Sequence, residues 1–101
     1  MILACAMPAL AQTGSISGKV TDSSGGVLPG VTVDARSNVL PGPRTTVSGT
    51  DGIYQLPALP PGDYTITYTL QGMQTVTKKA AVQLGQNASL DVSLGVGGVS
   101  E

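Results

Sequence analysis

Polar and apolar residues alternate strictly along residues 63–70. Every second position carries a large apolar side chain: Tyr64, Ile66, Tyr68 and Leu70. A period of two places these four side chains on one face of an extended strand and the threonines between them on the other. The segment before it, Leu59-Pro60-Pro61-Gly62, contains two residues that cannot donate to a β-ladder, so the strand begins after them. The pattern predicts a half-buried antiparallel strand.

Shorter alternating stretches recur about every ten residues between turn-forming residues, which is the spacing of a β-sandwich. We expect further strands at about Ser15–Thr21, Val31–Arg36, Thr45–Ser48, Ile53–Leu56, Met73–Lys79, Ala81–Leu84 and Ser89–Leu94. No segment of about ten residues has the period of a helix. The sequence therefore predicts an all-β fold, an antiparallel sandwich of about seven strands.

The composition excludes several function classes. The chain has 101 residues, no histidine, tryptophan or phenylalanine, and a formal net charge of -1. Without histidine the usual general base is missing and no serine has a triad partner, so we expect no catalysis. No Cys/His set exists for zinc, and we expect no cofactor. The only adjacent like charges are Lys78 and Lys79, so no basic stripe is present to bind nucleic acid.

Residues 1–11 read as the end of a secretory signal. A short apolar run leads to Pro8, and Ala9-Leu10-Ala11 is a small-x-small cleavage site before Gln12. No Lys or Arg precedes Lys19, so the positive part of the signal is expected upstream of this sequence. An alternative takes Cys5 as the acylated residue of a bacterial lipoprotein signal. Eleven residues are too few to span a membrane. Both interpretations predict an exported protein.

Four ordered motifs resemble those of the carboxypeptidase regulatory-like domain. They are Gly18–Asp22, Gly26–Val33, Asp51–Leu56 and Leu59–Ile66. The resemblance covers about Gly14 to Leu94 and implies a transthyretin-like (prealbumin-like) sandwich. We expect the domain at residues 12–94, followed by a glycine-rich linker at 95–101. Two positions depart from the family pattern: Gly49, where a polar residue is common, and Met73, where an aromatic is common.

The resemblance also implies a context. Such domains often stand at the N-terminus of TonB-dependent outer-membrane receptors, directly after the signal peptide. We therefore expect a non-catalytic accessory or interaction module located in the periplasm or cell outer membrane, with a protein partner or the parent receptor domains as its neighbours. It would act as a rigid spacer, or as a docking surface whose exposed strand edges accept a partner strand. The family is also grouped with starch-binding-like folds, so a carbohydrate-binding module is the alternative.

Three aspartates are candidate calcium ligands, since Asp22, Asp51 and Asp63 each lie in a glycine-containing turn. The competing interpretation is that such aspartates cap their own turns. Arg36 and Arg44 flank a proline-rich loop and mark either a peptide or partner contact or a solvated surface.

Sugar binding on a sandwich needs exposed aromatic rings, and the candidates are Tyr54, Tyr64 and Tyr68. The alternation favours burial of Tyr64 and Tyr68 instead. Asn87-Ala88-Ser89 matches the N-glycosylation pattern, which would be idle in a bacterium.

Overall fold

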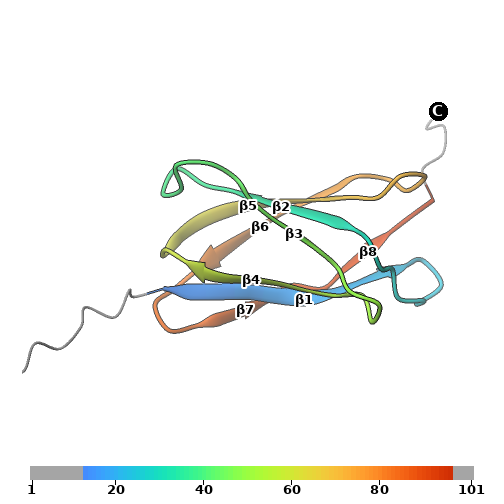
Figure 1. Ribbon diagram of the computed structural model, residues 1–101, viewed down its shortest axis with the longest axis horizontal. Helices are drawn as coiled ribbons and strands as arrows, with labels where there is room; N and C mark the ends of the chain where they lie inside the picture. Colours follow the sequence, from blue (N-terminus) through green and yellow to red (C-terminus); the bar gives the residue numbers. More distant parts are fainter. Residues whose placement is uncertain (1–12, 97–101) are drawn as a thin grey trace, which may run out of the picture.

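Two four-stranded β-sheets pack face to face in the computed structural model, which describes residues 13–96 (Figure 1). The first sheet has the order β4-β1-β7, with β8 also paired to β1, and the second has the order β3-β2-β5-β6. The strands are β1 (Gly14–Asp22), β2 (Thr32–Arg36), β3 (Arg44–Val47), β4 (Ile53–Leu59), β5 (Gly62–Thr69), β6 (Val76–Val82), β7 (Asn87–Ser89) and β8 (Val92–Leu94). The predicted all-β sandwich is confirmed.

Strand β5 is one of the two central strands of the second sheet and follows the predicted alternation. It pairs antiparallel with β2 on one side and with β6 on the other. Tyr64, Ile66 and Tyr68 are at most 1% exposed, and Leu70 packs partly buried against the same core. The face predicted to be buried is therefore the inner face of the sheet.

Strand β4 is longer than predicted, because it continues through Pro57 to Leu59. The β1–β4 register shifts between Gly14 and Ile16, so that β4 has one extra residue there and forms a bulge. Ala58 lies in this bulge with a φ of 56°, in the left-handed region that residues with a Cβ rarely adopt. A bulge on an edge strand tolerates proline, because the missing N–H costs no ladder bond.

Two predictions for the last third of the chain are wrong. The expected strands Met73–Lys79 and Ala81–Leu84 are one strand, β6. The expected strand Ser89–Leu94 is divided into β7 and β8. Both of these short strands pair with β1 in parallel, unlike the antiparallel pairs elsewhere in the sandwich. Alternation identifies an extended segment but not the direction of its partner.

The core lies between the inner faces of the two sheets. Fourteen hydrophobic residues form one buried cluster, to which both sheets contribute. Tyr54 of β4 and Tyr68 of β5 meet across the layers with ring centroids 5.5 Å apart and an interplanar angle of 71°. This edge-to-face contact is favourable beyond the buried area. Met73 also packs partly buried against the cluster, where its flexible side chain fills an irregular space.

The predicted signal segment, including Cys5, and the end of the predicted linker lie outside the described residues. Two residues assigned to that linker are described: the Gln74 N–H donates to the Gly95 carbonyl at 2.8 Å, and Met73 and Val96 form an isolated bridge. Between residues 13 and 96 the structure contains no helix with the length and apolarity needed to cross a membrane.

Candidate functional site

The three tyrosines, which were the candidates for sugar stacking, all lie in the core. Each is at most 1% exposed. The Tyr54 and Tyr68 hydroxyl oxygens are 2.7 Å apart, and the Tyr54 hydroxyl donates to the Leu90 carbonyl. The Tyr64 hydroxyl donates to the Pro60 carbonyl, in the turn before its own strand. These rings therefore hold the two layers and one corner together, and they offer no exposed platform.

Burial raises the pKa of all three tyrosines above the ordinary phenol value. For Tyr54 the upward shift caused by burial is the largest of the three. A phenol serves as an acid or base only when its pKa approaches the working pH. These shifts move the three phenols away from the working pH.

The hydrogen-bonded tyrosine pair is a feature that the sequence reasoning missed. Tyr54 and Leu56 alternate within the fourth strand, which is a signal for burial of Tyr54. A buried tyrosine needs a partner for its hydroxyl, and that requirement was the available clue. No sequence pattern identifies the partner, because Tyr54, Tyr68 and Leu90 come from three distant segments.

The candidate calcium ligands do not come together. Asp22 Oδ1 accepts hydrogen bonds from the Ser24 and Gly26 backbone N–H groups, both at 2.9 Å, and from the Ser24 hydroxyl at 2.6 Å. These bonds, led by that of the hydroxyl, hold the pKa of Asp22 below its ordinary value. Asp51 Oδ1 accepts from the Ile53 N–H at 3.1 Å.

Among residues 13–96, no three acidic, cysteine or histidine side chains cluster to hold a metal ion. The turn-capping interpretation therefore holds for Asp22 and Asp51. Asp63 lies exposed at the start of β5, beside a shallow depression of about 420 Å³ that Arg36 and Lys79 also line.

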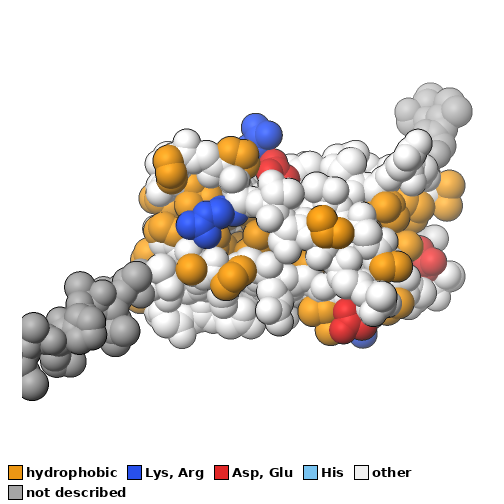
Figure 2. All heavy atoms as spheres, in the orientation of Figure 1, with side chains coloured by type: hydrophobic (Ala, Val, Ile, Leu, Met, Phe, Trp, Pro, Cys, Tyr) orange, Lys and Arg blue, Asp and Glu red, His pale blue; other side chains and the backbone are white. Residues whose placement is uncertain are grey.

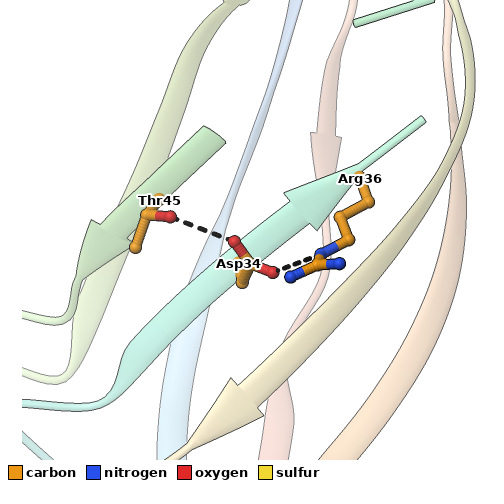
Figure 3. Close-up of polar contacts among 3 residues, drawn as sticks. All are labelled: Asp34, Arg36 and Thr45. Atoms are coloured by element: carbon orange, nitrogen blue, oxygen red, sulfur yellow. Dashed lines mark hydrogen bonds and ion pairs between the residues drawn. The ribbon is translucent and has the colours of Figure 1, made fainter. Parts of the chain in front are cut away.

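The outer face of the second sheet is rich in threonine. The strand register aligns six outward threonines across its four strands: Thr32, Thr45, Thr65, Thr67, Thr69 and Thr77. Among them Asp34 accepts a hydrogen bond from the Thr45 hydroxyl at 3.0 Å and pairs with the Arg36 guanidinium at 2.8 Å (Figure 3). The Arg36 side chain is 70% exposed, so this ion pair contributes at most about 1 kcal/mol.

Arg44, the second candidate for a partner contact, turns back onto the domain. One of its guanidinium nitrogens lies 3.4 Å from the Pro57 carbonyl and 3.3 Å from the Ala58 carbonyl. These carbonyls belong to the bulge of β4, so Arg44 connects β3 of the second sheet to β4 of the first. Sequence reasoning could not assign this role, because the bulge is a property of the sheet register.

Two of the edge strands, β4 and β6, carry features that discourage pairing with another chain. Pro57 lacks an N–H, and Arg44 covers the neighbouring carbonyls of β4. On β6, Lys78 occupies an inward position and its ammonium donates to the Asp91 carbonyl at 3.1 Å. Lys79 follows it on the outer face. Proline, bulges and inward-pointing lysines are devices that protect sheet edges.

The surface is otherwise weakly charged. Figure 2 shows isolated charged side chains on one face, with apolar side chains gathered toward the two ends of the sandwich. The exposed large hydrophobic residues are Val27, Val39, Val47, Ile53, Leu84 and Val96. They come from different loops and strands, and Val47 and Ile53 line the same shallow depression.

This arrangement defines a transthyretin-like β-sandwich whose polar side chains serve turns, edges and the contact between layers. The family model of the carboxypeptidase regulatory-like domain matches residues 15–95. The chain belongs to that family. It is also 36% identical over 87 residues to the TonB-dependent transporter Oar of Myxococcus xanthus, and the match covers 85% of this chain and 8% of the relative.

Solved structures support the fold. The TIE protein of Bacillus anthracis superposes with a TM-score of 0.73 at 21% identity, covering 84% of this chain and 17% of that one. BcpA, the major pilin subunit of Bacillus cereus, gives 0.65 at 21% identity, covering 85% and 31%. Catechol 1,2-dioxygenase of Acinetobacter radioresistens gives 0.66 at 13% identity, covering 86% and 53%. At these identities the likeness concerns the fold alone.

Proposed function

We propose that this domain is a non-catalytic accessory module of a TonB-dependent outer-membrane receptor, placed at its N-terminal side and acting as a rigid spacer. The observation that carries the proposal is the 36% identity to a TonB-dependent transporter across 85% of this chain. The chain spans only 8% of that relative, so the module is a small part of such a protein.

The hydrogen bonds of the polar side chains within the domain support the spacer role. The aspartates at the turns bind backbone, Arg44 holds a bulge, and Lys78 closes one edge of the sandwich. Carbohydrate binding, the other candidate, has no comparable support, because the three rings that would stack on a sugar are buried.

The test is to express the complete reading frame, extended on both sides of this sequence, with an epitope inserted in the exposed turn at Gln71–Gly72. We expect a plug-and-barrel continuation after Glu101 and the epitope in the outer-membrane fraction. A glycosidase continuation would favour sugar binding. Folded protein that stays in the cytoplasm with Met1 intact would contradict export.

A second experiment tests the accessory role within that parent protein. Deleting residues 14–95 in frame should leave receptor abundance and ligand binding at the cell surface unchanged. It should change the uptake of the ligand, which depends on the periplasmic side of the receptor. The matched control exchanges the segment for an unrelated sandwich of similar length, which a spacer role predicts will restore function. Loss of ligand binding on deletion would contradict an accessory role.

A further inference from the structure

The first and last strands of the domain lie side by side and run in the same direction. Strand β1 pairs in parallel with β7 through Ser15–Ser17 and with β8 through Val20–Asp22. The described chain enters the sandwich at one end, at the start of β1, and leaves it at the opposite end, after β8 (Figure 1). Tension between the two ends therefore pulls β1 and β8 in opposite directions along their own axes.

In this geometry the hydrogen bonds of the ladder share the load. Inter-strand bonds run across the strands, so sliding the strands lengthwise strains every bond together, whereas pulling strands apart from one end breaks them in turn. Each of the two parallel ladders contains three register pairs. Strand β1 is also held by β4 on its other side, so the segment that must slide is β7–β8.

The stretch between the two ladders continues the attachment. The Leu90 N–H donates to the Ser17 carbonyl at 2.8 Å, and the Lys19 N–H donates to Asp91 Oδ1 at 2.9 Å. Gly18 makes this close approach possible, because a Cβ at that position would lie 2.0 Å from the Leu90 carbonyl oxygen. The residues between β7 and β8 are therefore bonded to β1, as are the two strands themselves.

The same terminal segment is tied to other parts of the sandwich. The Tyr54 hydroxyl donates to the Leu90 carbonyl, and the Lys78 ammonium donates to the Asp91 carbonyl. Beyond β8, the Gln74 N–H holds the Gly95 carbonyl. Strands β4 and β6 and the turn before β6 thus each fix one point along the segment that would slide.

We infer that the paired ladders of β1 with β7 and β8 form a mechanical clamp, and that the domain is a force-bearing link that keeps its fold under tension between its ends. The inference rests on strand direction and hydrogen bonding. It does not depend on the receptor context, and a failure of either proposal leaves the other standing.

Single-molecule force spectroscopy tests the clamp by comparing two directions of pulling. The first places handles at the two ends of the 101-residue chain, which loads the clamp lengthwise. The second uses a C-terminal handle and a thiol handle from Ser23→Cys in a Cys5→Ser background. Ser23 follows β1 beside the end of β8, where Asp22 and Leu94 are register partners. This second arrangement peels β8 from β1.

We expect unfolding forces roughly two- to threefold higher for end-to-end pulling, because three register pairs in each ladder bear the load together. Equal forces in the two directions would overturn the inference. The comparison requires no substitution within the clamp, so it does not depend on the stability of a core variant.

Two matched variants locate the resistance. Asp91 and Asp51 are both exposed, and each accepts one backbone N–H bond, from Lys19 at 2.9 Å and from Ile53 at 3.1 Å. Only Asp91 lies in the clamp. Asp91→Ala should lower the end-to-end unfolding force, while Asp51→Ala should leave it unchanged, with circular dichroism confirming that both variants fold. Equal loss of force in both variants would overturn the assignment of the clamp to β1 and β7–β8.

Discussion

The hydroxyl groups of Tyr54 and Tyr68 should contribute unequally to stability, although their rings are equally buried. A carbonyl only accepts, so Tyr54 must donate its single proton to the Leu90 carbonyl. The proton in the bond between the two hydroxyls, which are 2.7 Å apart, then comes from Tyr68. The order of donation is Tyr68 to Tyr54 to Leu90, with Tyr54 in the middle.

Removing the middle hydroxyl removes two bonds and takes away the partner of the buried Tyr68 hydroxyl and of the partly buried Leu90 carbonyl. A net hydrogen bond is worth about 1 kcal/mol, and a buried polar group left unpaired costs about 1–3 kcal/mol. Tyr54→Phe should therefore lower the free energy of unfolding by about 3 kcal/mol. Tyr68→Phe removes one bond and leaves Tyr54 still donating to Leu90, so it should cost about 1 kcal/mol.

Urea unfolding of the single variants and the double variant measures these differences. Once Tyr54→Phe is present, Tyr68→Phe removes a hydroxyl that has already lost its partner, so the double variant should cost less than the sum of the single variants by about 2 kcal/mol. Tyr64→Phe is the control, because it removes one hydroxyl-to-carbonyl bond at a separate corner. If Tyr68→Phe proves as costly as Tyr54→Phe, the proposed order of donation is wrong.

Three further predictions concern backbone geometry and a turn. Gly18→Ala should cost about 3 kcal/mol in urea unfolding, because its Cβ would lie 2.0 Å from the Leu90 carbonyl oxygen, while Gly42→Ala, with open space around it, should change stability by less than about 0.5 kcal/mol. Ala58→Gly should raise the melting temperature, with a gain of about 0.5–1 kcal/mol, because φ is 56° at this position; a loss of stability would contradict the strain. The pKa of Asp22 is lowered in the fold, so its contribution is complete above the unfolded pKa of about 4 and is lost as the pH falls through the folded value. In Asp22→Asn, the free energy of unfolding measured in urea should therefore fall less steeply at acid pH than in the unmodified domain. An unchanged slope against pH would contradict this contribution.

The alternation of residues predicted those strands whose two sides differ. The segment around Tyr64 and Tyr68 has one face in the core and one in solvent, and it was located closely. The same reasoning divided β6 wrongly, because Lys78 occupies an inward position at an edge where its ammonium can reach the Asp91 carbonyl. An inward lysine is possible only where the two sheets open to solvent, and the sequence does not state which strand lies at that edge.

The direction in which the last strands pair could not be predicted from the sequence, for a different reason. Leu90, Val92 and Leu94 alternate as one strand, yet the chain shifts near Leu90 because its backbone approaches Gly18. The residues in contact lie far apart in the sequence: the Lys19 N–H donates to Asp91, 72 positions further along the chain. A local period carries no information about a partner so distant, whereas the glycine in β1 was a visible sign that another backbone passes close to it.

The edges and the clamp support the same use of the domain. An exposed strand edge would allow a partner to bind by adding a strand, but Arg44 and Pro57 occupy the free side of β4, and Lys78 turns inward on β6. A module that recruits partners through its edges would keep them open. One that links two parts of a larger protein needs closed edges, so that it does not aggregate, and a firm hold between its first and last strands. At β4 and β6 the hydrogen bonds are distributed in the second way, which favours a spacer over strand addition at these two edges.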